Sequence, residues 1–417
     1  MDYDQLLNGC SEVGRRMLAA GAEIYRVEDT VRRMLAAYGV DGQVFAIPNS
    51  LIVSMTDETG QSRTRLCRTE TAGSTDIETV ERFNALSRAV CAAPPPPERL
   101  PELARETAEH CRRYSVGIIL LGYFLGGMFF TLLFAGGSWL DALVGGGAAL
   151  LAGLSVLPMD KLQVNFFFKT VAAAAIIGAA VYGARAAGLA IDTGATIIGA
   201  LMVLVPGLVF TNFMCDLLTG DPLSGTSTFI RAVLTAAAIA IGTGAALSLF
   251  RALSLPADGV IHAVAYPLWA QLGFAFMACL GFGLLYNVHG WGVVLCCLGG
   301  VLGWLVFRAA DAAGTGIYLQ YLLSAIAIAI YAEVMARVRK FPITAYLVVS
   351  FFPLVPGSYI YYTMYYAIQG QRQLFMETGL QTIGLAACLA IGVLLVSTTV
   401  ATWTNWKRKK EARHGAL

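Results

Sequence analysis

The polar side chains that follow residue 210 are the groups of this chain best suited to chemistry in apolar surroundings. Asn212 and Asp216 are four residues apart and would share one face of a helix. A carboxylate partly withdrawn from water holds a proton more tightly, so Asp216 is a candidate carrier of a proton or binder of an ammonium group. The alternative is structural, because Asp216 and Asp221 could cap a helix and form the turn Gly220-Asp221-Pro222 at a membrane surface.

The tetrapeptide Leu-Val-Pro-Gly occurs twice inside long apolar segments, 150 residues apart. Pro206-Gly207 and Pro356-Gly357 should each interrupt a helix, because proline removes a backbone donor and disturbs the carbonyl one turn earlier. Polar backbone groups freed at membrane depth need a partner, water or a ligand, and a zwitterion or a carboxylate would satisfy them. We predict that both interruptions lie in the middle of a bilayer and line a substrate path; an ordinary proline kink is the alternative.

Two further features could take part in the same chemistry. Glu333 precedes Arg337 by four residues, so it either pairs with that arginine or serves as a second proton carrier. The second interruption is followed by hydroxyl-bearing side chains without a charge, which could bind a small substrate or form an interfacial aromatic belt. These are Ser358, Tyr359, Tyr361, Tyr362, Tyr365 and Tyr366, of which we take Tyr361 as a candidate substrate contact.

The composition places most of the chain in a membrane. Hydrophobic residues make up 57% and charged residues 13% of the 417 residues, and the mean hydropathy is +0.65. Residues 1–114 hold 31 of the 56 Asp, Glu, Lys and Arg side chains, which divides the chain into a soluble head and a membrane body. The net charge of +2 gives no basic footprint for nucleic acid. We find no nucleophile elbow, phosphate loop or metal-ligand spacing, and so predict no enzyme, no cofactor and no metal.

The membrane body is predicted to be mainly α-helical, with ten transmembrane helices arranged as a 5+5 inverted repeat. The 150-residue offset maps one half on the other, and five spans per half would insert the second half from the opposite face. Basic loops place both termini in the cytoplasm, and Met1-Asp2-Tyr3-Asp4 lacks the apolar run of a signal peptide. The predicted spans are 115–135, 139–158, 166–185, 190–210, 229–250, 263–284, 289–307, 316–335, 343–364 and 379–402.

The head is predicted to be a small α+β domain. Apolar residues spaced as in helices indicate two amphipathic helices before Gly39, and short β-branched runs then indicate a three-stranded meander. Asp76 should cap a helix that ends near Cys91, and a charged helix from Pro101 to about Arg113 should run directly into the first span. The predicted parts are the cytoplasmic domain 1–93, a proline-rich linker 94–114, membrane repeats 115–255 and 256–406, and a basic cytoplasmic tail 407–417.

The chain resembles the threonine/serine exporter family over nearly its whole length. The resemblance is carried by Gly21-Ala22-Glu23-Ile24-Tyr25-Arg26-Val27-Glu28, whose charges alone would indicate a solvated helix face, and by Phe45-Ala46-Ile47-Pro48. Its membrane part is Val205-Pro206-Gly207 with Asn212, Asp216, Leu217, Leu218, Gly220 and Asp221, and Val355-Pro356-Gly357 with Tyr361. The resemblance implies proton-driven export, by antiport, of small hydroxy amino acids across a bacterial inner membrane.

Two other functions remain open from the sequence. Members of the two-protein form of the family are linked to dicarboxylate export, for which a cationic site would be needed, and Arg231 is the arginine expected near the path. A head that senses a ligand on a membrane anchor is the third hypothesis, although two broken helices are hard to explain in an anchor. The expected partners are an amino-acid substrate, protons and lipid, with no nucleic acid; whether the chain forms a homo-oligomer is left open.

Overall fold

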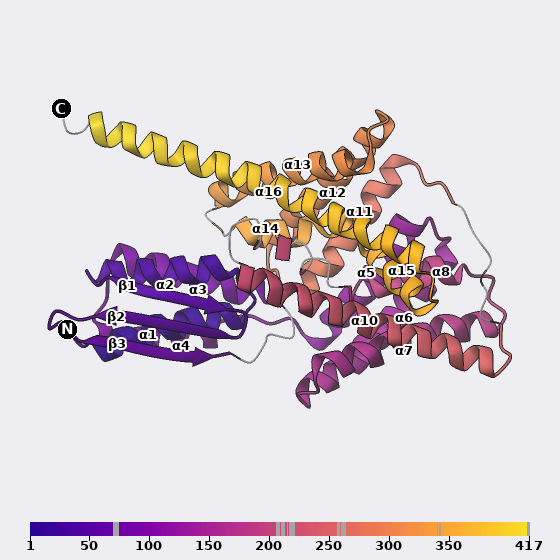
Figure 1. Cartoon of the computed structure of the whole chain (residues 1–417), viewed down its shortest axis with the longest axis horizontal. Coiled ribbons are helices and arrows are strands. Elements are labelled where there is room, and N and C mark those ends of the chain that lie inside the picture. The colour runs from indigo at the N-terminus through magenta and orange to yellow at the C-terminus, as the bar shows by residue number, and fades with distance from the viewer. Residues whose placement is uncertain are drawn as a thin grey trace. The chain divides into compact units, whose positions relative to one another are not determined.

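The computed structural model describes residues 1–69, 75–205, 209, 213–214, 216, 222–256, 259, 264–339, 341 and 343–414 (Figure 1). The chain divides into two compact units. One, which we call the head, consists of Met1–Ser115 together with Tyr286–His289; the other, the membrane unit, consists of Val116–Leu285 and Gly290–Leu417.

The head combines four helices with one three-stranded antiparallel sheet, as the sequence pattern predicted. The strands follow the order β1-β2-β3, and α1 and α2 pack against the sheet. Alternate strand residues face the helices: Val44, Leu51 and Val53 are buried with the apolar face of each amphipathic helix, because side chains alternate across a strand and recur every three or four residues on a helix. The elements are α1 (Tyr3–Ala19), α2 (Ile24–Ala37), β1 (Gly42–Ile47), β2 (Ser50–Thr56), β3 (Ser62–Arg68), α3 (Ile77–Ala92), η1 (Pro97–Arg99) and α4 (Leu100–Glu109).

The end of the head differs from the sequence-based prediction. The Asp76 carboxylate caps α3 as expected, accepting a hydrogen bond from the Thr79 backbone N–H at 3.2 Å. The charged helix, however, ends at Glu109 and does not run into the first span; residues 111–115 are non-helical. Leu100 and Ala104 of the segment expected to be a connector are buried in the core of the head, because α4 packs on α1.

The motif Gly21–Glu28 is more than a solvated helix face. The Glu28 carboxylate accepts a hydrogen bond from the Ala46 backbone N–H at 2.8 Å, on the edge of β1 that no strand covers in the described head. Glu23 and Arg26 form a half-buried ion pair at 3.6 Å. The prediction of a purely solvated face was therefore wrong, because the helix lies beside an unpaired strand edge whose backbone donors need acceptors.

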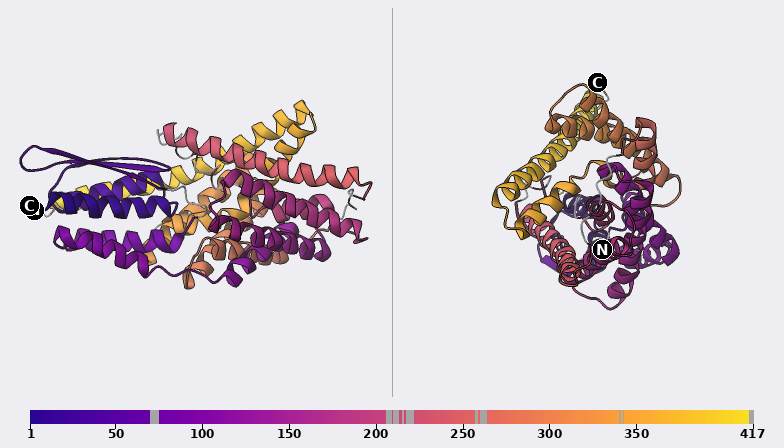
Figure 2. Two further views of the ribbon diagram at one scale, coloured as in Figure 1. Left: turned by 90° about the horizontal axis from the view of Figure 1, so that it is seen from below. Right: turned by 90° about the vertical axis from the view of Figure 1, so that its right-hand side faces the viewer.

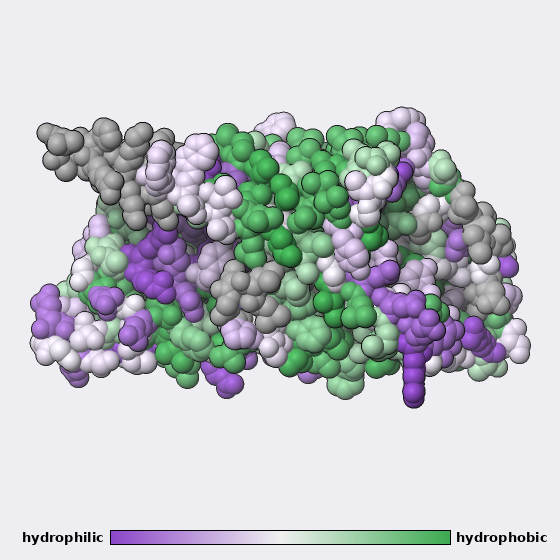
Figure 3. All heavy atoms as spheres, turned by 45° about the horizontal axis from the view of Figure 1, so that its top comes forward, coloured by the Kyte–Doolittle hydropathy of each residue, from purple (hydrophilic) through white to green (hydrophobic). Residues whose placement is uncertain are grey.

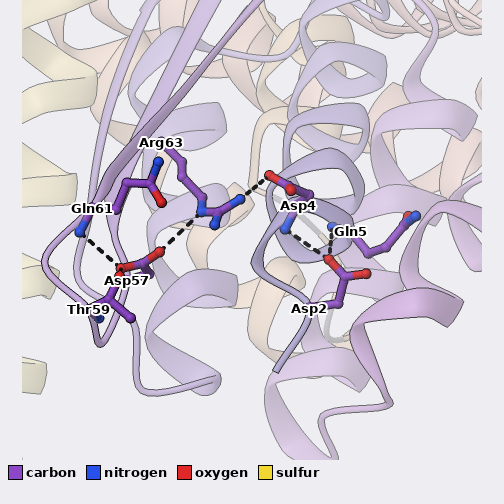
Figure 4. Close-up of polar contacts among 7 residues, drawn as sticks. All are labelled: Asp2, Asp4, Gln5, Asp57, Thr59, Gln61 and Arg63. Atoms are coloured by element: carbon purple, nitrogen blue, oxygen red, sulfur yellow. Dashed lines mark hydrogen bonds and ion pairs between the residues drawn. The ribbon is translucent and has the colours of Figure 1, made fainter.

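A polar cluster fastens the β2–β3 turn to the N-terminus of α1 (Figure 4). The Asp57 carboxylate accepts hydrogen bonds from the Thr59 hydroxyl at 2.5 Å, from two backbone N–H groups and from Arg63, which also pairs with Asp4. The Thr59 hydroxyl and the other donors lower the pKa of Asp57 below its usual value, because they stabilise the ionised form.

The head also contains the link between the helices α11 and α12 of the other unit. Asn287, at a φ of 58°, donates from its amide nitrogen to the Asp76 carboxylate at 2.9 Å and to the Arg112 carbonyl at 2.8 Å. The Ile77 N–H donates to the Tyr286 carbonyl, and the Tyr114 hydroxyl donates to the Val288 carbonyl. Sequence analysis did not anticipate this, since about 170 residues separate the two segments.

In the described part of the membrane unit, eight helices are long and apolar enough to cross a bilayer. Figure 2 shows these long helices running in broadly similar directions. Short links join most of them, so sequence neighbours are antiparallel. The eight are α5 (Val116–Ala135), α6 (Trp139–Lys161), α7 (Phe166–Ala186), α10 (Pro222–Ala252), α11 (Leu268–Leu285), α12 (Trp291–Ala312), α13 (Ile317–Arg339) and α16 (Arg372–His414).

The two predicted spans that contain Leu-Val-Pro-Gly are not continuous helices among the described residues, so the eight long helices do not confirm the predicted total of ten. The first is represented by α8 (Thr193–Leu201), which ends before the tetrapeptide. The second consists of α14 (Ile343–Ser350), a 3-10 turn η2 (Phe352–Leu354) and α15 (Gly357–Ile368). Sequence analysis expected breaks at these tetrapeptides because proline has no backbone N–H to donate to the preceding helical turn.

The surface of the membrane unit is apolar where lipid would contact it. Large hydrophobic side chains such as Leu121, Leu154 and Phe168 are exposed, and Figure 3 shows hydrophobic residues gathered over the middle of the visible face. Trp139 and Trp291 are exposed at the starts of α6 and α12. Tryptophan prefers the membrane–water boundary, so these residues mark interfaces.

Glycines allow the closest helix contacts of the membrane unit. A Cβ added at Gly122 of α5 would stand 2.9 Å from the carbonyl oxygen of Gly281 on α11, and one at Gly281 would stand 2.7 Å from the Gly126 nitrogen. Gly299 and Gly303 of α12 are equally crowded, by Ser350 and Ile328. The pairs Gly122-x-x-x-Gly126 and Gly299-x-x-x-Gly303 are therefore packing faces.

Candidate functional site

The second interruption lies against the residues that follow α8 in the membrane unit. A Cβ added at Gly357, the first residue of α15, would lie 2.3 Å from the Met202 methyl carbon and 3.5 Å from Val205 Cγ1. Met202 and Val205 follow α8 and come just before Pro206. A side chain at position 357 would have to displace the end of the Met202 side chain, so glycine here allows close approach of two segments about 150 residues apart in the chain.

The backbone around the second interruption is unwound but mostly enclosed. Val355 is extended, with φ of −61° and ψ of 126°, and the Gly357 N–H donates to the Val355 carbonyl at 2.7 Å. Phe352 stacks on Phe282 with ring centroids 3.5 Å apart, and residues 351–356 are buried. No side chain caps the N-terminus of α15, where the Pro356 position precedes the helix. This end offers backbone N–H donors and the positive pole of a helix.

Asp216 lies close to the start of α10. The Ser224 hydroxyl, fully buried in the first turn of that helix, donates to the Asp216 carboxylate at 2.8 Å. A half-buried carboxylate in the membrane unit with a hydroxyl partner matches the predicted polar position. The other predicted residues of this region, Pro206, Gly207, Asn212 and Asp221, lie outside the described residues.

Glu333 pairs with Arg337, one turn further along α13, at a distance of 3.4 Å. Its side chain is 18% exposed, whereas that of Arg337 is 57% exposed. The ion pair considered from the sequence is therefore present. An ion pair at the end of a span is a sufficient structural reason for this carboxylate.

Tyr361 lies one turn beyond Gly357 on α15 and lines a cavity between α7, α10 and α15. Its ring stacks on that of Tyr365 with centroids 6.0 Å apart, while Tyr362 stacks on Tyr366 in the same way on the neighbouring side of the helix. The tyrosine run is thus divided between two helix faces, and one of them faces the cavity. Most residues of this cavity were not identified from the sequence, since they come from three separate helices.

Asp141 is a fully buried carboxylate that sequence analysis missed. It completes a capping box with Ser138 at the start of α6, and it accepts a hydrogen bond from the Asp192 backbone N–H at 2.8 Å. Asp192 in turn caps α8. Asp141 therefore ties together the starts of α6 and α8. The signal was present as Ser138-x-x-Asp141 before an apolar run.

Among the described residues, no three His, Cys, Asp or Glu side chains are grouped closely enough to hold a metal ion. The polar groups that the membrane unit does assemble are hydroxyls, amides, a few carboxylates and arginines. Their chemistry is hydrogen bonding and charge pairing with a small polar solute.

Together, the apolar surface and the eight long helices of the described residues define a multi-pass membrane protein, in which the interruption before α15 lies against Met202 and Val205. The threonine/serine exporter family accounts for both halves of the chain: one family model described as a threonine/serine exporter matches residues 8–250, and a second matches residues 271–399. The chain belongs to this family. No solved structure matches it.

One curated relative is the threonine/serine exporter of Corynebacterium glutamicum. It is 23% identical to this chain over 407 residues, which cover 94% of this chain and 83% of the relative. The similarity therefore extends over head and membrane unit together.

Proposed function

We propose that this protein exports small hydroxy amino acids, threonine and serine, from the cytoplasm. The observation that carries the proposal is the match of exporter family models to both halves of the chain. The contact of Gly357 with Met202 and Val205 supports it further, because a solute path needs polar backbone at membrane depth from both halves.

In this proposal the interruptions form the middle of the path. The N-terminus of α15, which has no side-chain cap, offers N–H donors to the substrate carboxylate. Backbone carbonyls at the second interruption would receive the ammonium group, and Pro206, Gly207 and Asn212, which lie outside the described residues, are further proposed contacts. Closure of one half against the other would then expose the substrate to alternate sides.

An inverted repeat of two five-helix halves suits such alternating access. Corresponding helices start 150 to 152 residues apart, at Val116 and Leu268, Trp139 and Trp291, Phe166 and Ile317, Thr193 and Ile343, and Pro222 and Arg372. The same pairs pack in each half: first with second, second with third, third with fifth. The start of α5 at Gly122 lies against the end of α11 at Gly281, which supports an antiparallel relation between the halves.

Proton coupling is assigned to Asp216 in this proposal. Asp216 is the described carboxylate nearest to the first interruption in sequence. The hydrogen bond from the Ser224 hydroxyl can stabilise the ionised carboxylate, and this stabilisation would be lost when Asp216 is protonated. Glu333, which pairs with Arg337, and Asp221, which lies outside the described residues, are the alternative carriers. The protein would act as a proton antiporter in a bacterial inner membrane with both termini in the cytoplasm.

Proteoliposomes loaded with labelled threonine test the function. Under an imposed pH gradient, the wild-type protein should release threonine faster than protein-free vesicles, and serine should compete better than succinate. Stronger competition by succinate would instead favour dicarboxylate export, and release no faster than from protein-free vesicles would end the proposal.

The Asp216→Asn variant tests the coupling in the same vesicles. It should lose acceleration by the pH gradient while retaining threonine exchange, because the amide keeps hydrogen bonding but cannot carry a proton. Asp311→Asn is the matched control, since Asp311 is an exposed carboxylate paired with Arg308. Unchanged gradient dependence in Asp216→Asn would move the coupling to another residue.

A further inference from the structure

A cavity of about 160 Å³ lies between the C-terminal parts of α7, α10 and α15. It is open on one side, and the residues around it that sequence analysis had named as possible substrate binders are Tyr361 and Tyr365. The side chains and backbone around it are those of Tyr182, Ala240, Thr243, Gly244, Leu247, Ser248, Arg251, Tyr361, Tyr365 and Gln369.

Among the described residues, the lining has one cation and no carboxylate. Arg251, in the last turn of α10, forms no hydrogen bond or ion pair through its guanidinium with any residue that the structure describes. A guanidinium presents paired N–H donors that match a carboxylate, and such charge-assisted hydrogen bonds are among the strongest in proteins. The cavity is therefore chemically suited to a ligand with one carboxylate.

Aromatic rings and hydroxyls around the cavity could bind the other groups of such a ligand, an ammonium group and a hydroxyl. The Tyr361 and Tyr365 rings stack at 6.0 Å, and aromatic faces attract an ammonium group. Ser248 and Gln369 add neutral donors and acceptors, while the Thr243 hydroxyl already donates to the Ile239 carbonyl and can only accept. A second carboxylate would find no cation here, whereas an ammonium and a hydroxyl would both find partners.

The size of the cavity fits the same ligand. An apolar cavity of about 150 Å³ holds benzene, a molecule of six heavy atoms. Serine has seven heavy atoms and threonine eight, and this cavity is open on one side. A small hydroxy amino acid can enter with its carboxylate leading, whereas a larger aromatic amino acid would leave most of its side chain outside.

One face of α15 connects the residues of the cavity with the interrupted region. Gly357, Tyr361 and Tyr365 are spaced at i, i+4 and i+8 on α15, and Gly357 is the residue that touches Met202 and Val205. The C-terminal parts of three helices meet here, so these helices run in the same direction and the cavity lies at the end opposite to Val116. Given the proposed orientation, this end faces away from the cytoplasm.

We propose that this cavity is an amino-acid binding site on the release side of the path, with Arg251 holding the carboxylate and Tyr361 and Tyr365 facing the ammonium group. This inference rests on the proposed function and specifies it: a single cation and a tyrosine pair select a zwitterionic hydroxy amino acid over a dicarboxylate. An anionic lipid headgroup would share the carboxylate's attraction to Arg251, and the experiment must separate the two.

The test is equilibrium binding of labelled threonine to the purified full-length protein in nanodiscs of zwitterionic lipid. Arg251→Gln should weaken binding about tenfold or more, because it removes charge-assisted hydrogen bonds. Arg251→Lys should recover part of the loss. Arg308→Gln, which removes an arginine paired with Asp311 and outside the cavity, is the matched control and should bind like wild type.

Ligand analogues identify the group that Arg251 holds. In the wild-type protein, unlabelled threonine should compete well with labelled threonine, whereas 1-amino-2-propanol, which lacks the carboxylate, should compete poorly. The loss of affinity from removing the carboxylate should be about as large as the loss of threonine affinity in Arg251→Gln. Adding anionic lipid to the nanodiscs should leave threonine affinity unchanged; a loss that depends on anionic lipid and on Arg251 would assign the cavity to lipid and overturn the proposal.

Two outcomes separate this inference from the proposed function. If wild type exports threonine and Arg251→Gln binds and exports it equally well, the cavity assignment is wrong while export stands. If wild type neither binds nor exports threonine, both fail. Tyr361→Phe and Tyr365→Ala provide a second route should Arg251→Gln misfold: the alanine variant should weaken threonine binding more than the phenylalanine variant, because it removes an aromatic face.

Discussion

Replacing Gly199 with alanine tests how closely α8 must approach α5. An added Cβ at Gly199 would stand 2.1 Å from the Thr131 hydroxyl oxygen and 2.4 Å from both the nitrogen and the Cα of Thr131. Two of these neighbours are backbone atoms and cannot rotate away. The two helices would have to separate by roughly 1 Å in a closely packed interior.

The size of the effect follows from two opposing contributions. Overpacking of this kind costs about 1–3 kcal/mol, while alanine is about 1 kcal/mol better than glycine in a helix interior. Gly147→Ala on α6 isolates the second contribution, because a Cβ there meets nothing within 4 Å. The difference in unfolding free energy between the two variants should therefore be about 1–3 kcal/mol, with Gly199→Ala less stable.

The assay is denaturant unfolding in mixed micelles, followed by threonine efflux from proteoliposomes. Because α8 leads directly to Met202 and Val205, which contact Gly357, Gly199→Ala should also slow efflux, whereas Gly147→Ala should not. Equal stability and equal efflux in the two variants would refute the reasoning, since it would mean that α8 can move without disturbing the interrupted region.

Two predictions concern the head. The pKa of Asp57 is lowered in the folded state, so its contribution to stability is present above about pH 4, the usual pKa of an aspartate, and is lost as the pH falls through the pKa of the folded state. Hydrogen exchange in β2 and β3 should therefore accelerate in acid, and the acceleration should be less steep in Asp57→Asn. Asn287→Ala should lower the local stability of the head by about 1–3 kcal/mol, because it removes the hydrogen bonds to the half-buried Asp76 carboxylate and to the Arg112 carbonyl. The loss should appear as faster exchange at Ile77 and Tyr114 but not in β1, and unchanged exchange would contradict it.

Local features of the fold were predictable because they depend on neighbouring residues. The amphipathic helices, the meander and the cap at Asp76 follow from periodicity and capping chemistry within a few residues of sequence. The end of the charged helix at Glu109 was missed, since helix propensity continues beyond it and the chain turns there to meet Asn287.

The interruptions were predictable, but their detailed form was not. Pro356-Gly357 marks a break, yet only the structure places the 3-10 turn at Phe352 and the extended Val355 between α14 and α15. Pairing of distant residues requires the fold: Gly357 against Met202 depends on how α8 and α15 cross. The cavity was missed for the same reason, because Tyr182, Arg251 and Gln369 come from three elements and share no sequence motif.

The position of Tyr286–His289 within the head sets an order of events during synthesis. About 170 residues, including five complete membrane-crossing helices, are made between Ser115 and this link, which takes roughly ten to thirty seconds at usual elongation rates. During that interval Asp76 and the Arg112 carbonyl lack the amide that will join them. The nascent head can therefore complete its hydrogen bonds only after the chain up to α11 has been synthesised. Formation of the Asn287 contacts would thus mark the point at which synthesis has passed the first membrane repeat.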